Sequence, residues 1–197
     1  MSETLAESRA RVLQVAARRF AAKGFTGAQM GEIARDAGMG VGTLYKHFPS
    51  KEALFRAMVE RFLSALFGAT EAALAQQGGP FPEPLEAYTE AAIACVLSDP
   101  LVCRSVAQET LGSRVAFRQV IGADLWERIE THRARVAAFL GARPGQLRAG
   151  LSPEDAAVFF LGTLWTFVEH DLNRDALDRL PGRGKLVTRL VWKGVSP

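Results

Sequence analysis

The most constraining feature of this sequence is a pair of short amphipathic segments separated by a glycine-rich turn, within residues 29–54. Apolar residues recur at spacings of three and four through residues 30–37, which is typical of one face of a helix. The Gly-Met-Gly turn at residues 38–40 interrupts that helix, and the same spacing resumes at residues 41–48. Two helices joined by a short turn that contains glycine have the outline of a helix-turn-helix.

The second of these helices presents small, hydrogen-bonding and cationic groups to solvent. Its apolar residues take the inner positions, so the outer face carries Gly42, Thr43, Lys46 and His47, with Tyr45 at the edge. A helix that lies in a DNA groove needs groups of this kind, because it must approach phosphates and base edges. So short a helix is unstable alone, and the first helix must therefore hold it.

The run GTLYKHFPSKEALF at residues 42–55 resembles the signature of TetR-type bacterial transcriptional regulators. The similarity begins near residue 10, in the segment RVLQVAARRFAAKGF, and is detailed to about residue 62. Beyond that point it rests on helix pattern and chain length. The resemblance implies a homodimer joined through its last two long helices, and family habit favours repression. The residues in register with the family are Gly24, Ile33, Ala34, Ala37, Gly38, Tyr45, Phe48, Lys51 and Leu54.

Three residues depart from the family pattern around the helix-turn-helix. Gln29 stands where Ser or Thr usually caps the helix, Gly31 replaces a longer polar side chain, and Gly40 replaces a Ser. These changes imply fewer DNA contacts from the first helix. We expect phosphates to be held by Thr43, Tyr45, Lys46, His47 and Lys51, and base edges to be met by Val41, Gly42, Thr43 and Gln29.

The positive charge is unevenly distributed along the chain. Residues 1–67 hold ten Lys or Arg against six Asp or Glu, a net charge of +4, whereas the remainder has a net charge of −1. This asymmetry is expected if only the first segment meets phosphates. No secretory signal opens the sequence, and the longest uncharged apolar run, residues 156–168, is too short to span a bilayer. We expect a cytoplasmic protein without a membrane partner.

The helical pattern continues to the end of the chain, which predicts an all-α fold. We expect an N-terminal helix-turn-helix DNA-binding domain at residues 1–55 and a helical effector-binding and dimerisation domain at residues 56–197, linked mechanically by helix 51–75. Ser8, Ser50 and Ser152 are the expected helix N-caps. The other predicted helices cover residues 9–23, 30–37, 41–48, 85–97, 101–111, 115–140, 153–172 and 183–192.

Residues 153–172 form a helix that is apolar nearly all round, which requires burial on two sides. Its own domain covers one side, and a second copy of the chain would cover the other. A monomer with a thick core is the alternative. With the last helix, the expected dimer interface comprises Phe159, Phe160, Leu164, Phe167, Val187, Leu190 and Val191.

Aromatic and polar residues inside the second domain could line a cavity for a small-molecule effector, although each is also compatible with plain core. Glu109 and Glu169 could pair with Arg104 or His170, or await a cationic ligand. The candidate ligand-binding residues are Phe62, Leu66, Tyr88, Val96, Val106, Gln108, Glu109, Trp126, Ile129, Trp165 and Glu169.

Enzyme chemistry finds little support in the sequence. The three histidines, His47, His132 and His170, are too far apart for metal-ligand spacing, and nucleotide-binding or nucleophile motifs are absent, so we expect no metal and no cofactor. Cys95 and Cys103 are either small buried hydrophobic residues or a redox-sensing pair.

The hypothesis is therefore a ligand-responsive, sequence-specific DNA-binding regulator, most simply a repressor released by a small apolar or cationic effector. Two alternatives remain open. One is a small-molecule binding protein without a DNA role, and the other is an activator or architectural DNA-binding protein that needs no effector.

Overall fold

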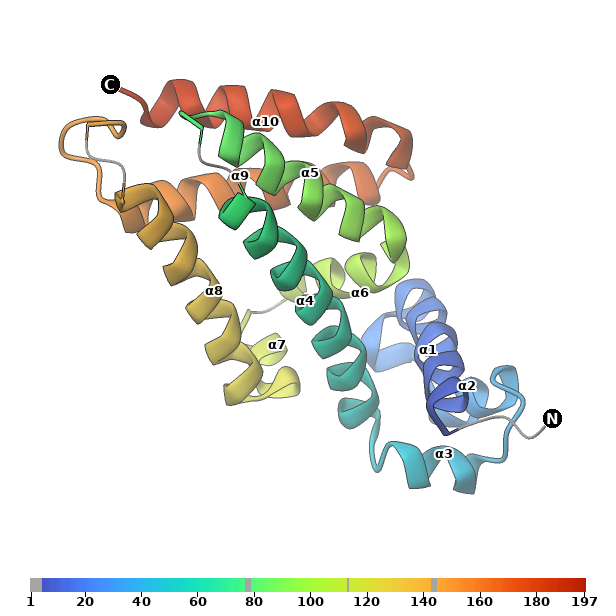
Figure 1. The fold of residues 1–197 in the computed structure, drawn as a ribbon. Helices are drawn as coiled ribbons and strands as arrows, with labels where there is room; N and C mark the ends of the chain where they lie inside the picture. The colour runs from blue at the N-terminus through green and yellow to red at the C-terminus, as the bar shows by residue number, and fades with distance from the viewer. Residues whose placement is uncertain (1–4, 77–78, 113, 143–144) are drawn as a thin grey trace. The chain divides into compact units, whose positions relative to one another are not determined.

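A computed structural model describes residues 5–76, 79–112, 114–142 and 145–197. Helices and connecting loops make up these ranges, which contain no strand, and the predicted all-α fold is confirmed (Figure 1). None of the helices in these ranges is both long enough and apolar enough to cross a bilayer. The elements are α1 (Leu5–Gly27), α2 (Met30–Asp36), α3 (Val41–His47), α4 (Lys51–Gln76), α5 (Glu83–Ser98), α6 (Pro100–Gly112), α7 (Arg114–Ile121), α8 (Ala123–Gly141), α9 (Pro153–Leu172), a 3-10 turn (Leu177–Arg179) and α10 (Leu180–Val195).

The contacts divide the chain into two compact units. The N-terminal unit contains residues up to Leu63 together with Asp99–Trp126, and the C-terminal unit contains Ser64–Ser98 together with Glu127–Pro197. The units differ from the two consecutive segments expected from the sequence, 1–55 and 56–197. The difference arises because α6 packs along α1, which brings α6 and α7 into the N-terminal unit.

The N-terminal unit is built on an aromatic cluster where α1 meets α4. The ring centroids of Phe20 and Phe55 lie 5.1 Å apart, and that of Phe25 lies 5.9 Å from Phe20 and 5.3 Å from Phe55. The edge-to-face arrangement of Phe55 with the other two rings is favourable by about 0.5–1.5 kcal/mol per pair beyond the area buried. This cluster stabilises a module that is small enough to be marginal by itself.

Two of the three expected helix caps are confirmed. The amide of Ala53 donates to the Ser50 hydroxyl oxygen at 3.1 Å, and the amide of Asp155 donates to the Ser152 hydroxyl oxygen at 3.0 Å. The expected Ser8 cap is wrong, because α1 already begins at Leu5 and contains Ser8. The helix extends further because Ala6 is a strong helix former and Glu7 in the first turn complements the helix dipole.

The single helix expected at residues 115–140 is divided at Gly122 into α7 and α8. Gly122 has a φ of +85°, which a helix cannot contain and which L side chains rarely adopt. The apolar positions continue on both sides of the break, with Ile121 and Leu125 both buried. The hydrophobic pattern therefore carried no sign of the interruption.

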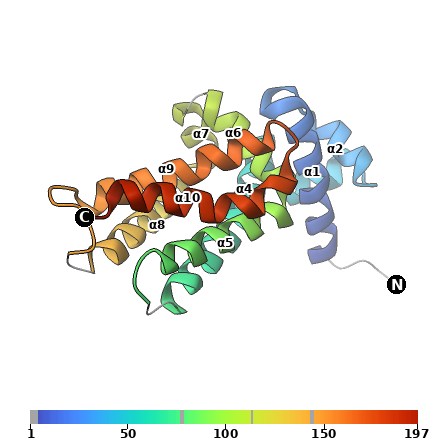
Figure 2. The same ribbon diagram turned by 90° about the horizontal axis from the view of Figure 1, so that it is seen from above.

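In the C-terminal unit, α10 lies against α5 and runs antiparallel to α9 (Figures 1 and 2). Asp171 at the end of α9 is fully buried and accepts two hydrogen bonds from the Arg183 guanidinium, at 2.7 and 3.0 Å. These bonds hold the pKa of Asp171 below its ordinary value. The last helix is longer than the expected 183–192, because Leu180 and Val195 at its two ends are both buried.

We predict that Gly24→Ala lowers the free energy of unfolding by about 1–2 kcal/mol, since Gly24 has a φ of +68°. The added Cβ would meet the nearest Glu109 oxygen at 3.7 Å, an ordinary contact, so the penalty is backbone strain. Gly31→Ala is the control. Its Cβ meets nothing within 4 Å in α2, and it should stabilise by about 0.5–1 kcal/mol. Urea unfolding measures both, and a Gly24→Ala variant as stable as the parent would contradict the prediction.

Candidate nucleic-acid interface

Helix α3 is held from one side and open on the other. Leu44 is fully buried and Phe48, at the C-cap, is nearly so, and these two side chains anchor α3 to its unit. Val41 and Tyr45 are 44% and 47% exposed, which is unusual for large apolar and aromatic side chains. The structure thus brings most of the residues predicted to bind DNA to one exposed helix face, namely Val41, Gly42, Thr43, Tyr45 and Lys46.

The remaining predicted contacts lie at the edges of this face. Gln29 is exposed at the N-cap of α2 and makes no side-chain cap, as its poor capping propensity predicts. His47 is half-buried at the end of α3. Its carbonyl accepts a hydrogen bond from Arg9 at 3.3 Å, and the Arg9 guanidinium lies 4.3 Å over the Phe48 ring. Arg9 therefore fixes the end of α3, a role that the sequence did not indicate.

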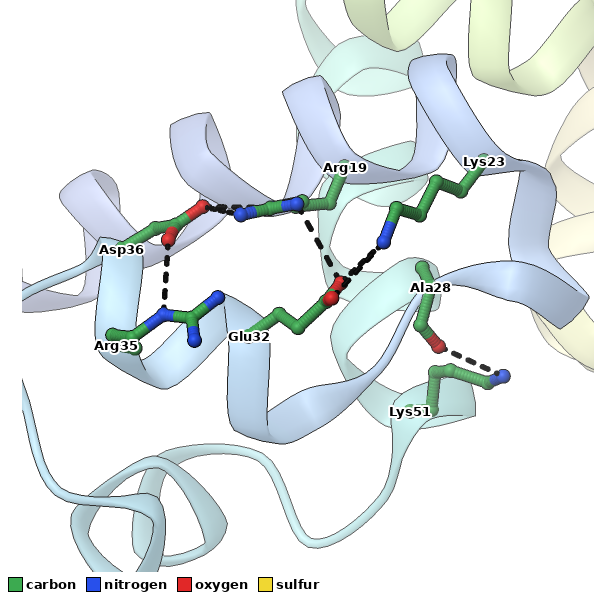
Figure 3. A network of polar contacts seen from close by, with 7 residues as sticks. All are labelled: Arg19, Lys23, Ala28, Glu32, Arg35, Asp36 and Lys51. Carbon is green, nitrogen blue, oxygen red and sulfur yellow. Dashed lines mark hydrogen bonds and ion pairs between the residues drawn. The ribbon is translucent and has the colours of Figure 1, made fainter.

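An ion-pair network joins α1 to α2 (Figure 3). The Lys23 ammonium lies 2.9 Å from a Glu32 carboxylate oxygen, and Arg19 pairs with both Glu32 and Asp36. The hydrogen bond from Lys23, aided by nearby arginines, lowers the pKa of Glu32. Two of the ten Lys and Arg residues counted in residues 1–67, Arg19 and Lys23, are thus used to hold α2 against α1. By contrast, no hydrogen bond or ion pair within the described ranges occupies the Lys46 ammonium.

A sequence signal for this network was available. Arg19 and Lys23 are four residues apart in one predicted helix, and Glu32 and Asp36 are four apart in the next. Residues at this spacing share a helix face, so two facing helices with opposite charges predict such pairs.

Lys51 was expected to hold a phosphate, and the structure gives its ammonium internal partners. It donates to the carbonyl oxygen of Ala28 at 3.2 Å (Figure 3). It also donates to the carbonyl oxygen of Thr26 at 3.2 Å and lies 4.7 Å from the centroid of the Phe25 ring. A lysine ammonium has three donors, so one remains for a phosphate. Lys51 first of all ties the turn between α1 and α2 to the start of α4.

The residues predicted to bind an effector fall into both units. Phe62, Val106, Gln108, Glu109 and Trp126 belong to the N-terminal unit, and the other six, Leu66, Tyr88, Val96, Ile129, Trp165 and Glu169, belong to the C-terminal unit.

Two of these residues have a structural role that the prediction missed. Glu109 accepts a hydrogen bond from the Phe25 amide at 2.8 Å, and Gln108 donates to the Ala21 carbonyl at 3.3 Å. The expected partners of Glu109, Arg104 or His170, are therefore replaced by a backbone amide.

A buried polar network occupies the C-terminal unit. His132 is 5% exposed, its Nε2 lies 2.8 Å from the Tyr88 hydroxyl, and its Nδ1 lies 3.1 Å from a Glu71 carboxylate oxygen. Burial lowers the pKa of His132, although the Glu71 carboxylate acts in the opposite direction. The ring also stacks on Phe67 at 4.1 Å between centroids. His132 is thus a satisfied core histidine, and Tyr88 is engaged by it.

The residues predicted for dimerisation divide into a buried and an open set. Phe160, Leu164, Val187 and Val191 are buried inside the protomer, because α9 and α10 pack on each other with these faces. These four side chains have almost no exposed surface with which to contact a partner, so their prediction as interface residues is corrected. The open set comprises Phe159 and Leu190, 48% and 49% exposed, with Phe167 half-buried.

Phe159 and Phe167 of this open set also line a shallow, open groove. It has a volume of about 400 Å³ and lies on the outer face of α9. None of the predicted effector residues lines it. The lining residues are Val158, Phe159, Gly162, Thr163, Thr166 and Phe167.

The two cysteines are free thiols. Cys103 is buried and Cys95 is half-buried, and they belong to different units. Burial raises the pKa of Cys95, which disfavours the reactive thiolate. This favours the reading of small hydrophobic residues over that of a redox-sensing pair.

We predict that Lys51→Met lowers the free energy of unfolding by about 1–2 kcal/mol, because two backbone carbonyls lose a charged donor. Lys46→Met is the matched control and should change stability by less than about 0.5 kcal/mol, since Lys46 is exposed. Urea unfolding distinguishes the two. Equal stability of the two variants would show that the Lys51 contacts contribute nothing.

Comparison with known proteins agrees with the sequence resemblance. Residues 12–58 match the family described as "Bacterial regulatory proteins, tetR family". The chain is 39% identical over 72 residues to an uncharacterized HTH-type transcriptional regulator, YdgC, of Bacillus subtilis (strain 168), a match that spans 36% of this chain and 37% of YdgC.

Solved structures of low sequence identity share the fold. The fatty acid degradation regulator FadR from Bacillus halodurans has a TM-score of 0.79 and 20% identity, over 94% of this chain and 98% of that one. FadR from Bacillus subtilis in complex with stearoyl-CoA has a TM-score of 0.80 and 20% identity, with the same coverage. The family and these relatives are regulators rather than enzymes. Residues 12–58, which contain the helix-turn-helix, are therefore similar to the tetR family of bacterial regulatory proteins, and the whole chain shares its fold with solved regulators.

Proposed function

We propose that this chain is a cytoplasmic DNA-binding transcriptional repressor that acts as a homodimer and leaves its operator when a small-molecule effector binds. The observation that carries the proposal is the open face of α3. Its large residues Val41 and Tyr45 remain about half exposed, although Leu44 of the same helix is fully buried. A helix anchored in this way, with an exposed cation at Lys46, suits the major groove of DNA.

The proposed contacts divide by chemistry. Lys46 and the third donor of Lys51 supply charge to phosphates, and the hydroxyl groups of Thr43 and Tyr45 and the His47 ring supply hydrogen bonds. At Gly42 an added Cβ would meet nothing within 4 Å, so packing inside the protomer does not require the glycine. A missing side chain there lets the α3 backbone approach the bases. Val41, Thr43 and Gln29 complete the base-reading set.

A second copy of the chain is the proposed occupant of the open α9 and α10 surface. Val158, Phe159 and Leu190 are each about half exposed, and the groove beside them has no charged residue in its lining. In a twofold dimer each protomer offers the same groove and the same apolar side chains, so the surface is self-complementary in type. Two recognition helices would then read two half-sites.

We favour an apolar effector over a cationic one. The cationic alternative rested on Glu109 and Glu169, and the Glu109 carboxylate is engaged by the Phe25 amide. The FadR structure with stearoyl-CoA supports a molecule with a long apolar part. Helix α4 continues from the N-terminal unit into the C-terminal unit, so it provides a covalent route from an effector to the DNA-binding face. Effector and operator binding would be reciprocally coupled.

Fluorescence anisotropy with two duplexes tests the proposal, one taken from upstream of the chain's own gene and one scrambled. Specific binding that survives physiological salt supports a regulator. If the chain binds both duplexes equally and physiological salt abolishes this binding, the small-molecule binding protein without a DNA role is favoured. Specific binding that no effector weakens favours the activator or architectural alternative. A screen of acyl-CoA compounds supplies the effector arm.

We predict that Lys46→Ala weakens binding to both duplexes by a similar factor and reduces the salt dependence, because one phosphate contact per protomer is lost. The slope of log K against log salt should fall by about 1 for each contact removed. Lys185→Ala is the matched control, since Lys185 is exposed on α10 of the C-terminal unit. An unchanged slope for Lys46→Ala would remove Lys46 from the phosphate contacts.

We predict that Phe159→Glu dissociates the dimer at micromolar concentration, because each copy would bring a carboxylate to an apolar surface. Ala138→Glu, at an exposed position of α8, is the control and should remain dimeric. Sedimentation velocity reports the mass of both variants. A dimeric Phe159→Glu variant would place the interface on another surface, and a monomeric parent would contradict the homodimer itself.

A further inference from the structure

The C-terminal part of α1 contains a backbone interruption. Gly24 has φ and ψ of 68° and 173°, which turns the chain out of the helical conformation. In an uninterrupted helix the Phe25 amide would donate to the Ala21 carbonyl four residues earlier. The interruption removes this bond and leaves both groups open to other partners, which backbone groups of a folded protein almost always have.

Helix α6 provides a partner for each of these two groups from adjacent residues. The Glu109 carboxylate accepts from the Phe25 amide at 2.8 Å, and the Gln108 side-chain amide donates to the Ala21 carbonyl at 3.3 Å. An acceptor and a donor from α6 thus replace the two ends of one missing helix bond. The partners lie 84 and 87 residues apart in sequence.

The segment that Glu109 holds leads directly to the DNA-binding face. The Phe25 ring packs against Phe55 and lies under the Lys51 ammonium. The next residues, Thr26 and Ala28, offer the carbonyls that Lys51 binds, and α2 begins two residues later. The Phe25 amide is therefore held close to the start of α2 and to the two carbonyls that Lys51 of α4 binds.

We infer that Glu109 is a positioning residue for the DNA-binding face, with Gln108 as its companion, and this inference rests on the proposed function. Glu109 touches no DNA in this scheme and acts through Phe25 and the turn that follows.

The test compares Glu109→Ala with Glu109→Gln, whose side-chain oxygen can still accept a hydrogen bond. Thr110→Ala is the matched control, because the Thr110 hydroxyl bonds only to carbonyls of its own helix, Val106 and Ala107, at 3.0 Å. Amide hydrogen exchange at Phe25 reports the contact, and anisotropy with the specific duplex reports DNA binding. Circular dichroism verifies that each variant is folded.

We expect Glu109→Ala to speed exchange of the Phe25 amide about tenfold, the factor for a lost charge-assisted hydrogen bond, and to weaken specific DNA binding severalfold. Glu109→Gln should restore both properties to within about twofold of the parent, and Thr110→Ala should change neither. Glu109→Gln keeps the hydrogen-bond acceptor, whereas Glu109→Ala removes it. Parental DNA affinity in the Gln variant would therefore assign the loss in the Ala variant to the missing side chain and its hydrogen bond rather than to the missing charge.

Unchanged exchange at Phe25 in Glu109→Ala would overturn the inference, as would faster exchange with unchanged DNA affinity. If Glu109→Ala fails to fold, Glu109→Gln decides. A Gln variant with parental exchange at the Phe25 amide but weakened binding to the specific duplex would also overturn the inference. Failure of the proposed function is separate, since the parent protein itself would then not discriminate the duplexes. In that case faster exchange at Phe25 would still support a positioning role in the turn.

Discussion

The contact of the Phe25 ring with Phe55 and the Lys51 ammonium is the interaction on which the DNA-binding face depends. It lies where α1 ends, where the chain turns toward α2, and where α4 begins. Aromatic and cation–π contacts contribute about 0.5–1.5 kcal/mol each, a large share of the stability of so small a module. The buried side chains of Leu44 and Phe48 anchor α3 to this module. They stabilise α3, which is too short to form a stable helix alone.

The local signals of the sequence were sufficient for the helix-turn-helix and for several helix ends. Ser152 with Pro153 predicted the start of α9, because an N-cap hydroxyl and a proline at the first helical position act within one turn. The exposed face of α3 could be predicted in part from the 3.6-residue period, which correctly placed Gly42, Thr43 and Lys46 outward. Val41, which its apolar spacing placed inside, is 44% exposed, and His47 is half-buried. Each of these features depends on residues that are close in the chain.

Features that depend on distant residues could not be read from the pattern. Periodicity identifies an apolar face but does not say which element covers it. Phe160 and Leu164 were therefore assigned to a partner although both are buried within the protomer, where the Phe160 ring packs against Tyr88 of α5. Glu109 was assigned to a ligand because its true partner, a backbone amide, carries no side-chain signature. Gly122 interrupts a continuous apolar stripe, so its positive φ was visible only in the structure.

The distribution of charge supports the proposed dimer. Arg19 and Lys23 are engaged with Glu32 and Asp36, so they contribute to the fold more than to phosphate binding. Few cations then remain on the proposed DNA face of one protomer, and the electrostatic part of binding scales with the number of phosphates neutralised. One module would bind weakly, and two held at a defined separation would multiply their affinities. In the proposed dimer, regulation would act by changing the separation of the two α3 helices. The turn held by Glu109 and Lys51 lies beside the start of α4, because Lys51 is the first residue of that helix.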